Sequence, residues 1–282
     1  MAFEKWQALG NDYLIVERDG LPWELTAARV QLLCDPHFGV GSDGVLMLAP
    51  SDDPEFVAEL RIFNPDGSEA ELSGNGAREA ILYLRRHGWT DADEFAIWTV
   101  AGPIRPTITG ELTCSVDMGH ASTVSKDFPS GGEEGRGTLT SGGREWEFQH
   151  VSVGNPQCAI VVSRPELERL DLGALGPGIE GSDLFPNRTN VSFLSIDGSR
   201  VRARIFERGV GETLSSGTGA CGAAVTAFLR GSQSPITVEL DGGELEVEVG
   251  DDLAVTLTGW AQQICSGQLS PELAKALAAA NQ

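Results

Sequence analysis

The sequence predicts an α+β protein built from two similar domains. Strand-like stretches outnumber helical ones, and one strand–loop–helix unit occurs twice, 143 residues apart (206 − 63). The length of 282 residues permits two domains of about 140 residues, each large enough to bury a core of its own. The hydrophobic fraction of 41% is that of an ordinary globular chain, which excludes disorder as a global description.

The internal repeat fixes the expected domain boundaries. Residues 63–84, FNPDGSEAELSGNGAREAILYL, match residues 206–227, FERGVGETLSSGTGACGAAVTA, with Ser73 over Ser216. A second element places Asn11 of LGND over Asn155 of VGNP at nearly the same offset, 144. We therefore expect two pseudo-symmetric domains, residues 1–118 and 119–262, whose repeated loops face each other across a cleft. We expect the C-terminal helix in residues 263–282 to pack back on the first domain.

Period-two alternation and β-rich composition predict the strands. A GDD turn between two such runs predicts a hairpin. By contrast, residues 125–143 are rich in glycine, proline, acidic residues and serine, and they predict a mobile surface loop. The expected strands are Phe56–Phe63, Arg200–Phe206, Pro235–Leu240, Glu244–Val249 and Leu253–Leu257.

Capping residues and glycine-rich turns predict four helices. Thr26–Cys34 opens with a threonine N-cap, and Ser270–Ala280 opens with Ser-Pro, an N-cap followed by proline at the first helical position. Gly76–His87 and Gly219–Arg230 each follow a glycine-rich turn, and these two helices belong to the repeat.

Composition excludes several classes of function. A net charge of −21 is unsuited to a phosphate backbone, so we expect no nucleic-acid partner. The five cysteines form no CxxC pair and the four histidines no HExxH motif, so neither a disulfide framework nor a metal site is expected. Three lysines make a pyridoxal Schiff-base enzyme improbable. No apolar run of 18 residues and no basic, apolar leader occur, so we expect a cytoplasmic protein without membrane contact.

Two GxGxxG matches, Gly39–Gly44 and Gly217–Gly222, raise the alternative of a dinucleotide site. That site needs the motif directly after a buried strand within a βαβ unit. Polar residues precede Gly217, and no clear helix follows Gly44, so this alternative is disfavoured.

The repeated Ser-Gly-x-Gly-Ala loop suits a different chemistry. Its glycines leave amide N–H groups uncovered at a helix N-terminus, which binds an anion without lysine or arginine. Two such ends can hold one carboxylate and stabilise the enediolate that forms when an α-proton leaves. Ser73 and Ser216 would then flank the α-carbon, one accepting a proton and the other donating one. The alternative is that both serines are only N-caps.

Six motifs in order carry a family resemblance: KWQALGNDY, FGVGSDGVL, FNPDGSEAELSGNGAR, VSVGNPQ, FPNRTNVSF and FERGVGETLSSGTGACGAA. Together they resemble diaminopimelate epimerase along essentially the whole chain. The resemblance implies two domains, each a mixed or antiparallel sheet wrapped around a central helix. It also implies a homodimer without a cofactor that interconverts LL- and meso-diaminopimelate on the path to lysine.

The resemblance also assigns site residues one by one. Four asparagines match substrate-binding positions, a Glu-Arg pair is expected to contact the amino and carboxylate groups, and two helix starts supply amides. These residues are Asn11, Asn64, Asn155, Asn190, Glu207, Arg208, Gly74, Asn75, Gly217 and Thr218.

The chain departs from the family pattern at three positions. Ser73 and Ser216 stand where the family has its two catalytic cysteines, and Gln157 stands where the family usually has histidine. A serine hydroxyl is a far weaker acid than a thiol and normally needs an adjacent base. Three alternatives stay open: an epimerase by descent whose thiols have been replaced, an isomerase of a related amino acid, or a non-catalytic amino-acid-binding protein.

Overall fold

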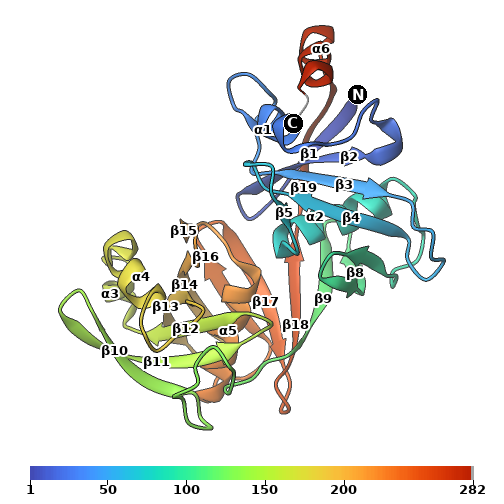
Figure 1. Cartoon of the computed structure of the whole chain (residues 1–282). Coiled ribbons are helices and arrows are strands. Elements are labelled where there is room, and N and C mark those ends of the chain that lie inside the picture. Colours follow the sequence, from blue (N-terminus) through green and yellow to red (C-terminus); the bar gives the residue numbers. More distant parts are fainter. Residues whose placement is uncertain (281–282) are drawn as a thin grey trace. The chain divides into compact units, whose positions relative to one another are not determined.

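The computed structural model describes residues 1–280 and divides the chain into two compact units (Figure 1). The first unit contains Met1–Val116 together with the chain from Trp260 onward, and the second contains Asp117–Gly259. Nearly all of the helices and strands are short, and strands predominate in both units. No helix among the described residues is both long enough and apolar enough to cross a membrane.

The sheet of the first unit has the strand order β19-β1-β2-β3-β4-β6-β7, and β5 pairs with β4. Buried and more exposed residues alternate along most of β4, whereas β3 is buried throughout. The elements are β1 (Ala2–Ala8), β2 (Asn11–Glu17), a 3-10 turn (Arg18–Gly20), α1 (Ala27–Cys34), β3 (Val45–Ala49), β4 (Ala58–Phe63), β5 (Glu69–Ala70), α2 (Gly74–Arg86), β6 (Ile97–Thr99), β7 (Gly102–Ile104), β19 (Gln262–Gln268) and α6 (Pro271–Ala279). Outside this sheet, β8 (Pro106–Gly110) pairs with β9 (Thr113–His120), and β9 begins in the first unit and ends in the second.

The sheet of the second unit has the strand order β10-β11-β12-β13-β14-β16-β17-β18 and continues through β9 to β8, and β15 pairs with β14. Two short helices, α3 and α4, also pack on this sheet. Gly176 of α4 lies against Phe206 and Gly219 of α5 lies against Ile205, and these neighbours on β14 point to opposite faces, so α4 and the central helix α5 cover different faces. The elements are β10 (Arg136–Ser141), β11 (Arg144–Ser152), β12 (Pro156–Val161), α3 (Arg164–Leu167), α4 (Leu172–Glu180), β13 (Asn190–Asp197), β14 (Arg200–Glu207), β15 (Gly211–Thr213), α5 (Gly217–Leu229), β16 (Ile236–Leu240), β17 (Gly243–Val249) and β18 (Ala254–Trp260).

The two units repeat the same pairing pattern. In the first unit, β1 and β2 are antiparallel, β2 and β3 parallel, β3 and β4 antiparallel, and β4 and β6 parallel. In the second, β11 and β12 are antiparallel, β12 and β13 parallel, β13 and β14 antiparallel, and β14 and β16 parallel. In both, the fourth strand forms a short hairpin and a helix follows. The predicted fold of two similar α+β halves is therefore confirmed.

Each central helix is enclosed by its own sheet. Helix α5 contacts six strands, β11 to β14, β16 and β17. Six strands spaced about 4.8 Å apart span roughly twice the width of a helix, so the sheet must curve around α5 to reach it. Residues 219–227 are all buried, which requires small or apolar side chains on every side of this helix. Helix α2 contacts β1, β2 and β3, and residues 75–84 are buried.

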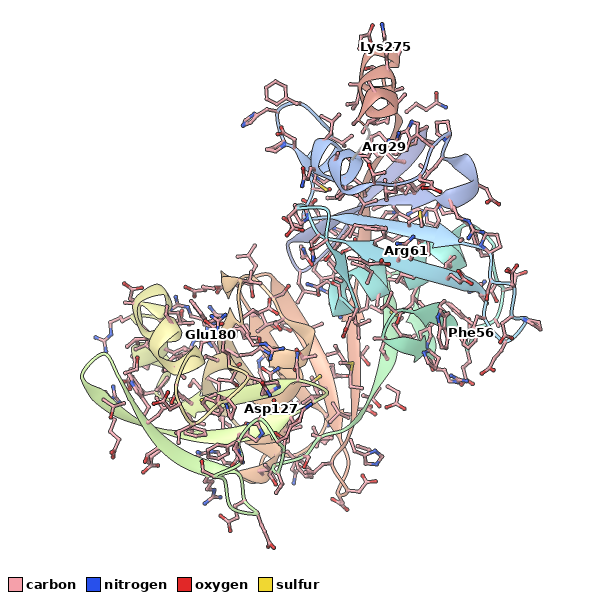
Figure 2. All side chains as sticks on the ribbon, viewed as in Figure 1. Arg29, Phe56, Arg61, Asp127, Glu180 and Lys275 are labelled. Atoms are coloured by element: carbon pink, nitrogen blue, oxygen red, sulfur yellow. The ribbon has the colours of Figure 1, made fainter. Side chains whose placement is uncertain are left out.

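The C-terminal helix α6 packs on α1 within the first unit. Leu277 is fully buried in the same core cluster as Val30 and Leu33. Arg29, labelled in Figure 2, donates from Nε to the Leu277 carbonyl oxygen at 2.8 Å. Ser270 caps α6 by accepting from the Leu273 N–H, as the Ser-Pro signal predicts.

One expectation is wrong in part. Residues 125–143 do not form a single loop, because residues 136–141 form β10, which pairs with β11 along its whole length. Leu139 and Ser141 are buried while Thr138 and Thr140 are exposed, so this segment has the alternation of a half-buried strand. Its flanking glycines obscured that short pattern.

Candidate active site

Ser73 lies at the N-terminus of α2 and is half-buried. Its Oγ accepts the Gly76 N–H at 3.1 Å, so it is an N-cap. The same Oγ also accepts the hydroxyl of Tyr13 at 3.2 Å. The Tyr13 ring reaches this position because residue 44 is glycine: a Cβ there would lie 2.6 Å from the ring. Since Ser73 accepts in both bonds, its own hydroxyl proton can be directed to another acceptor.

Ser216 lies at the N-terminus of α5 and is 4% exposed. Its Oγ accepts the Gly219 N–H at 3.3 Å, so it too is an N-cap. Unlike Ser73, it donates its proton, to Oε2 of Glu207 at 3.0 Å. Oε1 of Glu207 accepts the Thr213 hydroxyl at 2.9 Å, which orients the carboxylate toward the serine. Ser216 therefore has the adjacent base that a serine hydroxyl needs to accept a proton.

The internal repeat identifies the residues that give the two serines different hydrogen-bond partners. At the offset of 143, Glu207 corresponds to Asn64, which is an amide and bonds to Ser68 at 3.0 Å. At the offset of 144, Tyr13 corresponds to Gln157, which bonds to Asn155 at 2.6 Å. In the second unit the serine is thus hydrogen-bonded to a carboxylate, and in the first unit the serine is hydrogen-bonded to a phenol.

Two of the four predicted substrate asparagines, Asn11 and Asn155, contact the start of the central helix in their own unit. Asn75 donates to Asn11 Oδ1 at 3.3 Å, and Asn11 donates to Asp43 at 3.0 Å. In the second unit Asn155 makes the equivalent contact with Thr218, at 3.2 Å. Within the first unit the start of α2 thus lies against the first residue of β2, and within the second unit the start of α5 lies against the turn before β12.

The other two asparagines act separately. Asn190 accepts the Arg208 N–H at 2.9 Å and donates to the Pro156 carbonyl oxygen at 3.2 Å, so it holds the turn that carries Arg208. Arg208 is exposed and donates to the Asn187 carbonyl oxygen at 2.9 Å. Asn64 belongs to the turn after β4 and is bonded to Ser68, at 2.8 Å through the backbone.

The start of each helix can bind an anion. The capping serines use the third and fourth N–H groups: Ser73 accepts from Gly76 and Ala77, and Ser216 accepts from Gly219 and Ala220. The N–H groups of Gly74 and Gly217 come first in their helices and have no acceptor within the helix. Together with the partial positive charge of the helix end, they can stabilise a carboxylate.

The cysteines do not replace the missing thiols. No disulfide forms, and Cys34, Cys114, Cys158 and Cys221 are buried. Burial raises the pKa of Cys114 to about 12 and also raises the pKa of Cys158. Cys221 lies inside α5 with no exposed surface, as its position five residues after Ser216 predicts. Cys265 on β19 is exposed.

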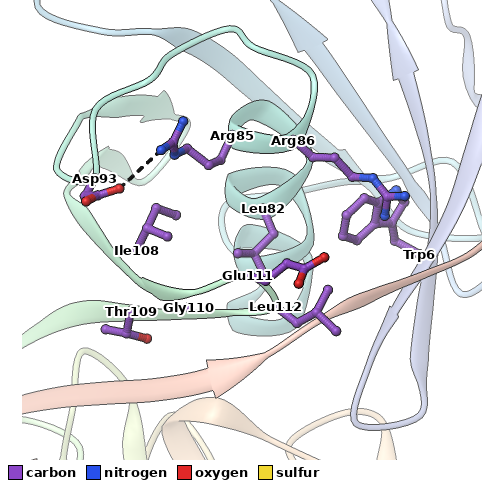
Figure 3. Close-up of a pocket in the computed structure, with 10 residues that line it drawn as sticks. All are labelled: Trp6, Leu82, Arg85, Arg86, Asp93, Ile108, Thr109, Gly110, Glu111 and Leu112. Atoms are coloured by element: carbon purple, nitrogen blue, oxygen red, sulfur yellow. Dashed lines mark hydrogen bonds and ion pairs between the residues drawn. The ribbon is translucent and has the colours of Figure 1, made fainter.

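Neither a metal cluster nor the cavity at the other end of α2 marks the site. Within residues 1–280 no group of three or more histidine, cysteine, aspartate or glutamate side chains could hold a metal ion. A cavity of about 550 Å³ lies at the far end of α2, where Arg85 pairs with Asp93 and Arg86 lies over Trp6 (Figure 3). Its lining includes none of the predicted site residues.

Sequence reasoning missed three participants: Tyr13, Thr213 and Asp43. Tyr13 had a signal in the sequence, because the repeat places it opposite Gln157, which was already singled out. Thr213 and Asp43 had none, since they reach the site only through the β14–β15 hairpin and the loop before β3.

Comparisons with known proteins show which family the chain is similar to. The family model described as diaminopimelate epimerase matches residues 3–124 and 149–264. Diaminopimelate epimerase 2 of Nostoc sp. is 38% identical, and the match covers 97% of each chain. Diaminopimelate epimerase of Synechococcus sp. is 39% identical over 95% of this chain and 97% of that one.

Solved structures share the fold at low identity. A protein described as a putative phenazine biosynthesis PhzC/PhzF protein from Clostridium difficile has a TM-score of 0.68 at 13% identity, covering 96% of this chain and 99% of that one. A hydroxyproline epimerase from Agrobacterium vitis has a TM-score of 0.65 at 16% identity, covering 97% and 94%. At these identities the likeness concerns the fold alone.

Proposed function

Because the chain belongs to the diaminopimelate epimerase family, we propose that it is a cofactor-independent isomerase that interconverts LL- and meso-diaminopimelate. The observation that carries this proposal is the pair of unlike serines. Ser216 has a carboxylate to receive its proton, whereas Ser73 receives a hydrogen bond and keeps its own proton available. An inversion needs one acceptor and one donor on opposite faces of the α-carbon.

The proposed proton transfers balance as follows. The Cα–H bond breaks as Ser216 Oγ takes the proton, and the Ser216 hydroxyl proton passes to Glu207 Oε2. On the opposite face, the Ser73 O–H proton passes to the α-carbon, and the Tyr13 hydroxyl proton replaces it on Ser73. The reverse reaction runs the same relay backwards, and before another turnover in the same direction Glu207 releases its proton to water and Tyr13 takes one from water. Between the two transfers the carboxylate carries extra negative charge, which the N–H groups at the helix starts stabilise.

Exchange in deuterated water tests this proposal. LL-diaminopimelate incubated with the protein in D₂O should lose its α-proton NMR signal and yield the meso isomer. Binding without exchange would instead favour a non-catalytic amino-acid-binding protein. Exchange with another amino acid, but not with diaminopimelate, would favour an isomerase of a related substrate.

Arg208 is proposed to bind the distal carboxylate, since it is the exposed cation of the Glu-Arg pair and its turn is held by Asn190. Arg208→Ala is expected to weaken diaminopimelate binding by roughly 2–5 kcal/mol, the cost of removing a charged partner. Lysine, which lacks the distal carboxylate, should lose much less affinity. Calorimetry with both ligands measures the difference. Equal losses for both would contradict the assignment.

A homodimer is also proposed, and β19 supports it. This strand lies at the edge of its sheet, and its sequence QQICSGQ carries no charge and no proline, the usual protections of an exposed edge. Ile264 is 52% exposed on it. Pairing of β19 with a second copy would cover this edge.

The proposed compartment is the cytoplasm. The five cysteines form no disulfide, which favours a reducing compartment.

Ile264→Lys is expected to convert the dimer to a monomer, because an edge lysine opposes strand pairing. Light scattering after gel filtration measures the mass. Leu229→Lys, at another partly exposed apolar position, is the control and should leave the mass unchanged. A parent protein that is already monomeric would overturn the dimer proposal.

A further inference from the structure

Glu79 is a buried carboxyl that the proposed reaction does not use. It lies in the interior of α2 with no exposed surface. Neither of its carboxylate oxygens has a well-formed hydrogen bond with a described residue, and the backbone N–H of Tyr13 is the polar group that acts on it. An ionised carboxylate in such a place is costly, because burial removes the water that would otherwise solvate its charge.

The groups around Glu79 hold the site of the first unit. Glu79 follows Asn75 by four residues, so the two share one face of α2. Asn75 bonds to Asn11, and Asp43 accepts both the Asn11 side chain and the Asp12 N–H at 3.0 Å.

The charged groups that act on Glu79 come from three elements. Arg78 lies on the same helix, Asp12 on β2, and Asp43 in the loop before β3. Lys5 of β1 pairs with Asp12 at 3.3 Å. Desolvation by burial raises the pKa of Glu79 well above its ordinary value, and the charges of Asp12 and Asp43 add to the rise, whereas Arg78 and the backbone N–H of Tyr13 oppose it. The neutral form is therefore favoured, and ionisation would put a third negative charge beside Asp12 and Asp43.

The fold itself does not require a carboxyl at this position. At the offset of 143, Glu79 corresponds to Gly222 of α5, where a Cβ would lie 2.9 Å from Gln157 Cβ. The second unit thus has no side chain at the equivalent place. Buried Glu180, labelled in Figure 2, is a contrast, since it accepts from Gly209 at 2.7 Å and pairs with Arg188 at 2.6 Å.

We propose that Glu79 is a positioning residue that works in its neutral form, keeping Asn11, Asp43 and Tyr13 in the arrangement that binds the ligand. Loss of its proton repels Asp12 and Asp43 and loosens the contact between Asn11 and Asn75. This inference rests on the proposed function, because Asn11 is taken to contact diaminopimelate and Tyr13 to serve Ser73.

Glu79→Gln tests the inference, because glutamine keeps the shape and cannot ionise. The Kd of diaminopimelate for the parent should rise with pH more steeply than for the variant. The ratio of the two Kd values cancels the titration of the ligand and should change by roughly tenfold, the equivalent of one pKa unit. A ratio that stays constant between pH 5 and 9 would overturn the inference. Glu79→Leu, of similar volume, should reproduce the flat profile if the glutamine variant does not fold.

Stability against pH separates this inference from the proposed function. A carboxyl with a raised folded-state pKa loses its stabilising proton as pH rises above the unfolded value, so the parent should lose stability from about pH 4.3 upward. Glu79→Gln should remove that loss, whereas Glu180→Gln should destabilise at neutral pH by removing a paired charge. If no variant binds diaminopimelate at any pH, the proposed function fails. If Glu79→Gln leaves the stability profile unchanged, the inference fails by itself.

Discussion

Replacing both Ser73 and Ser216 by cysteine is expected to raise α-proton exchange of diaminopimelate by ~10²–10⁴-fold, the usual contribution of general acid–base catalysis. Both serines cap helix N-termini, through Gly76 and Gly219. A thiol has a pKa near ~8.5, and a helix N-terminus lowers it into the working range, whereas a serine hydroxyl is not ionised in this way. The rate of deuterium incorporation measured by NMR gives the result.

A third capping serine of this chain provides the control for the expected gain in exchange rate. Ser270→Cys changes an N-cap with the same bond, to the Leu273 N–H, and should leave exchange unchanged. Either single variant should gain less than the double, because inversion needs a group on each face. Each lost serine cap costs about 1 kcal/mol of stability, so unfolding is measured in parallel. No gain in a folded double variant that binds ligand would contradict the proposed role of these positions.

Much of the fold was predictable because the sequence contains the same strand–loop–helix unit twice. The repeat at 143 residues predicts two similar halves, and the two central helices begin two residues before the predicted Gly76 and Gly219. The difference arises because the capping serine sets the helix start, and glycine can occupy the first turn. Strand β10 was missed, since its alternation covers only six residues between glycines. The pairing order of the strands depends on contacts far apart in the sequence, which no local pattern encodes.

The sequence predicted most residues of the candidate site, but it did not predict which of them are hydrogen-bonded to one another. Ser73, Ser216 and Glu207 were all identified from the sequence, yet sequence spacing gave no reason to join Glu207 to Ser216, nine residues later. The hairpin β14–β15 folds back between them and brings Thr213 onto the same carboxylate. Tyr13 likewise reaches Ser73 across 60 residues through the sheet. Hydrogen bonds of this kind depend on side-chain directions that only the assembled unit defines.

Glu207→Gln is expected to lower α-proton exchange by ~10²–10⁴-fold, because an amide cannot take the proton that Ser216 passes on. The change keeps the size of the side chain, and Thr213 can still donate to its oxygen, so folding should be retained. The loss should fall mainly on kcat. Glu212→Gln, which changes an exposed carboxylate on the adjacent strand β15, is the matched control and should have little effect.

The same substitution in the double cysteine variant distinguishes a base from a structural residue. A thiolate at position 216 already carries the negative charge, so it accepts the α-proton with much less need of Glu207. Glu207→Gln should therefore cost the cysteine protein far less than it costs the serine protein, and the two effects should not add. A residue that only shaped the loop would cost both proteins equally. Equal losses in the two backgrounds would show that Glu207 binds or orients the ligand and that the base for Ser216 lies elsewhere.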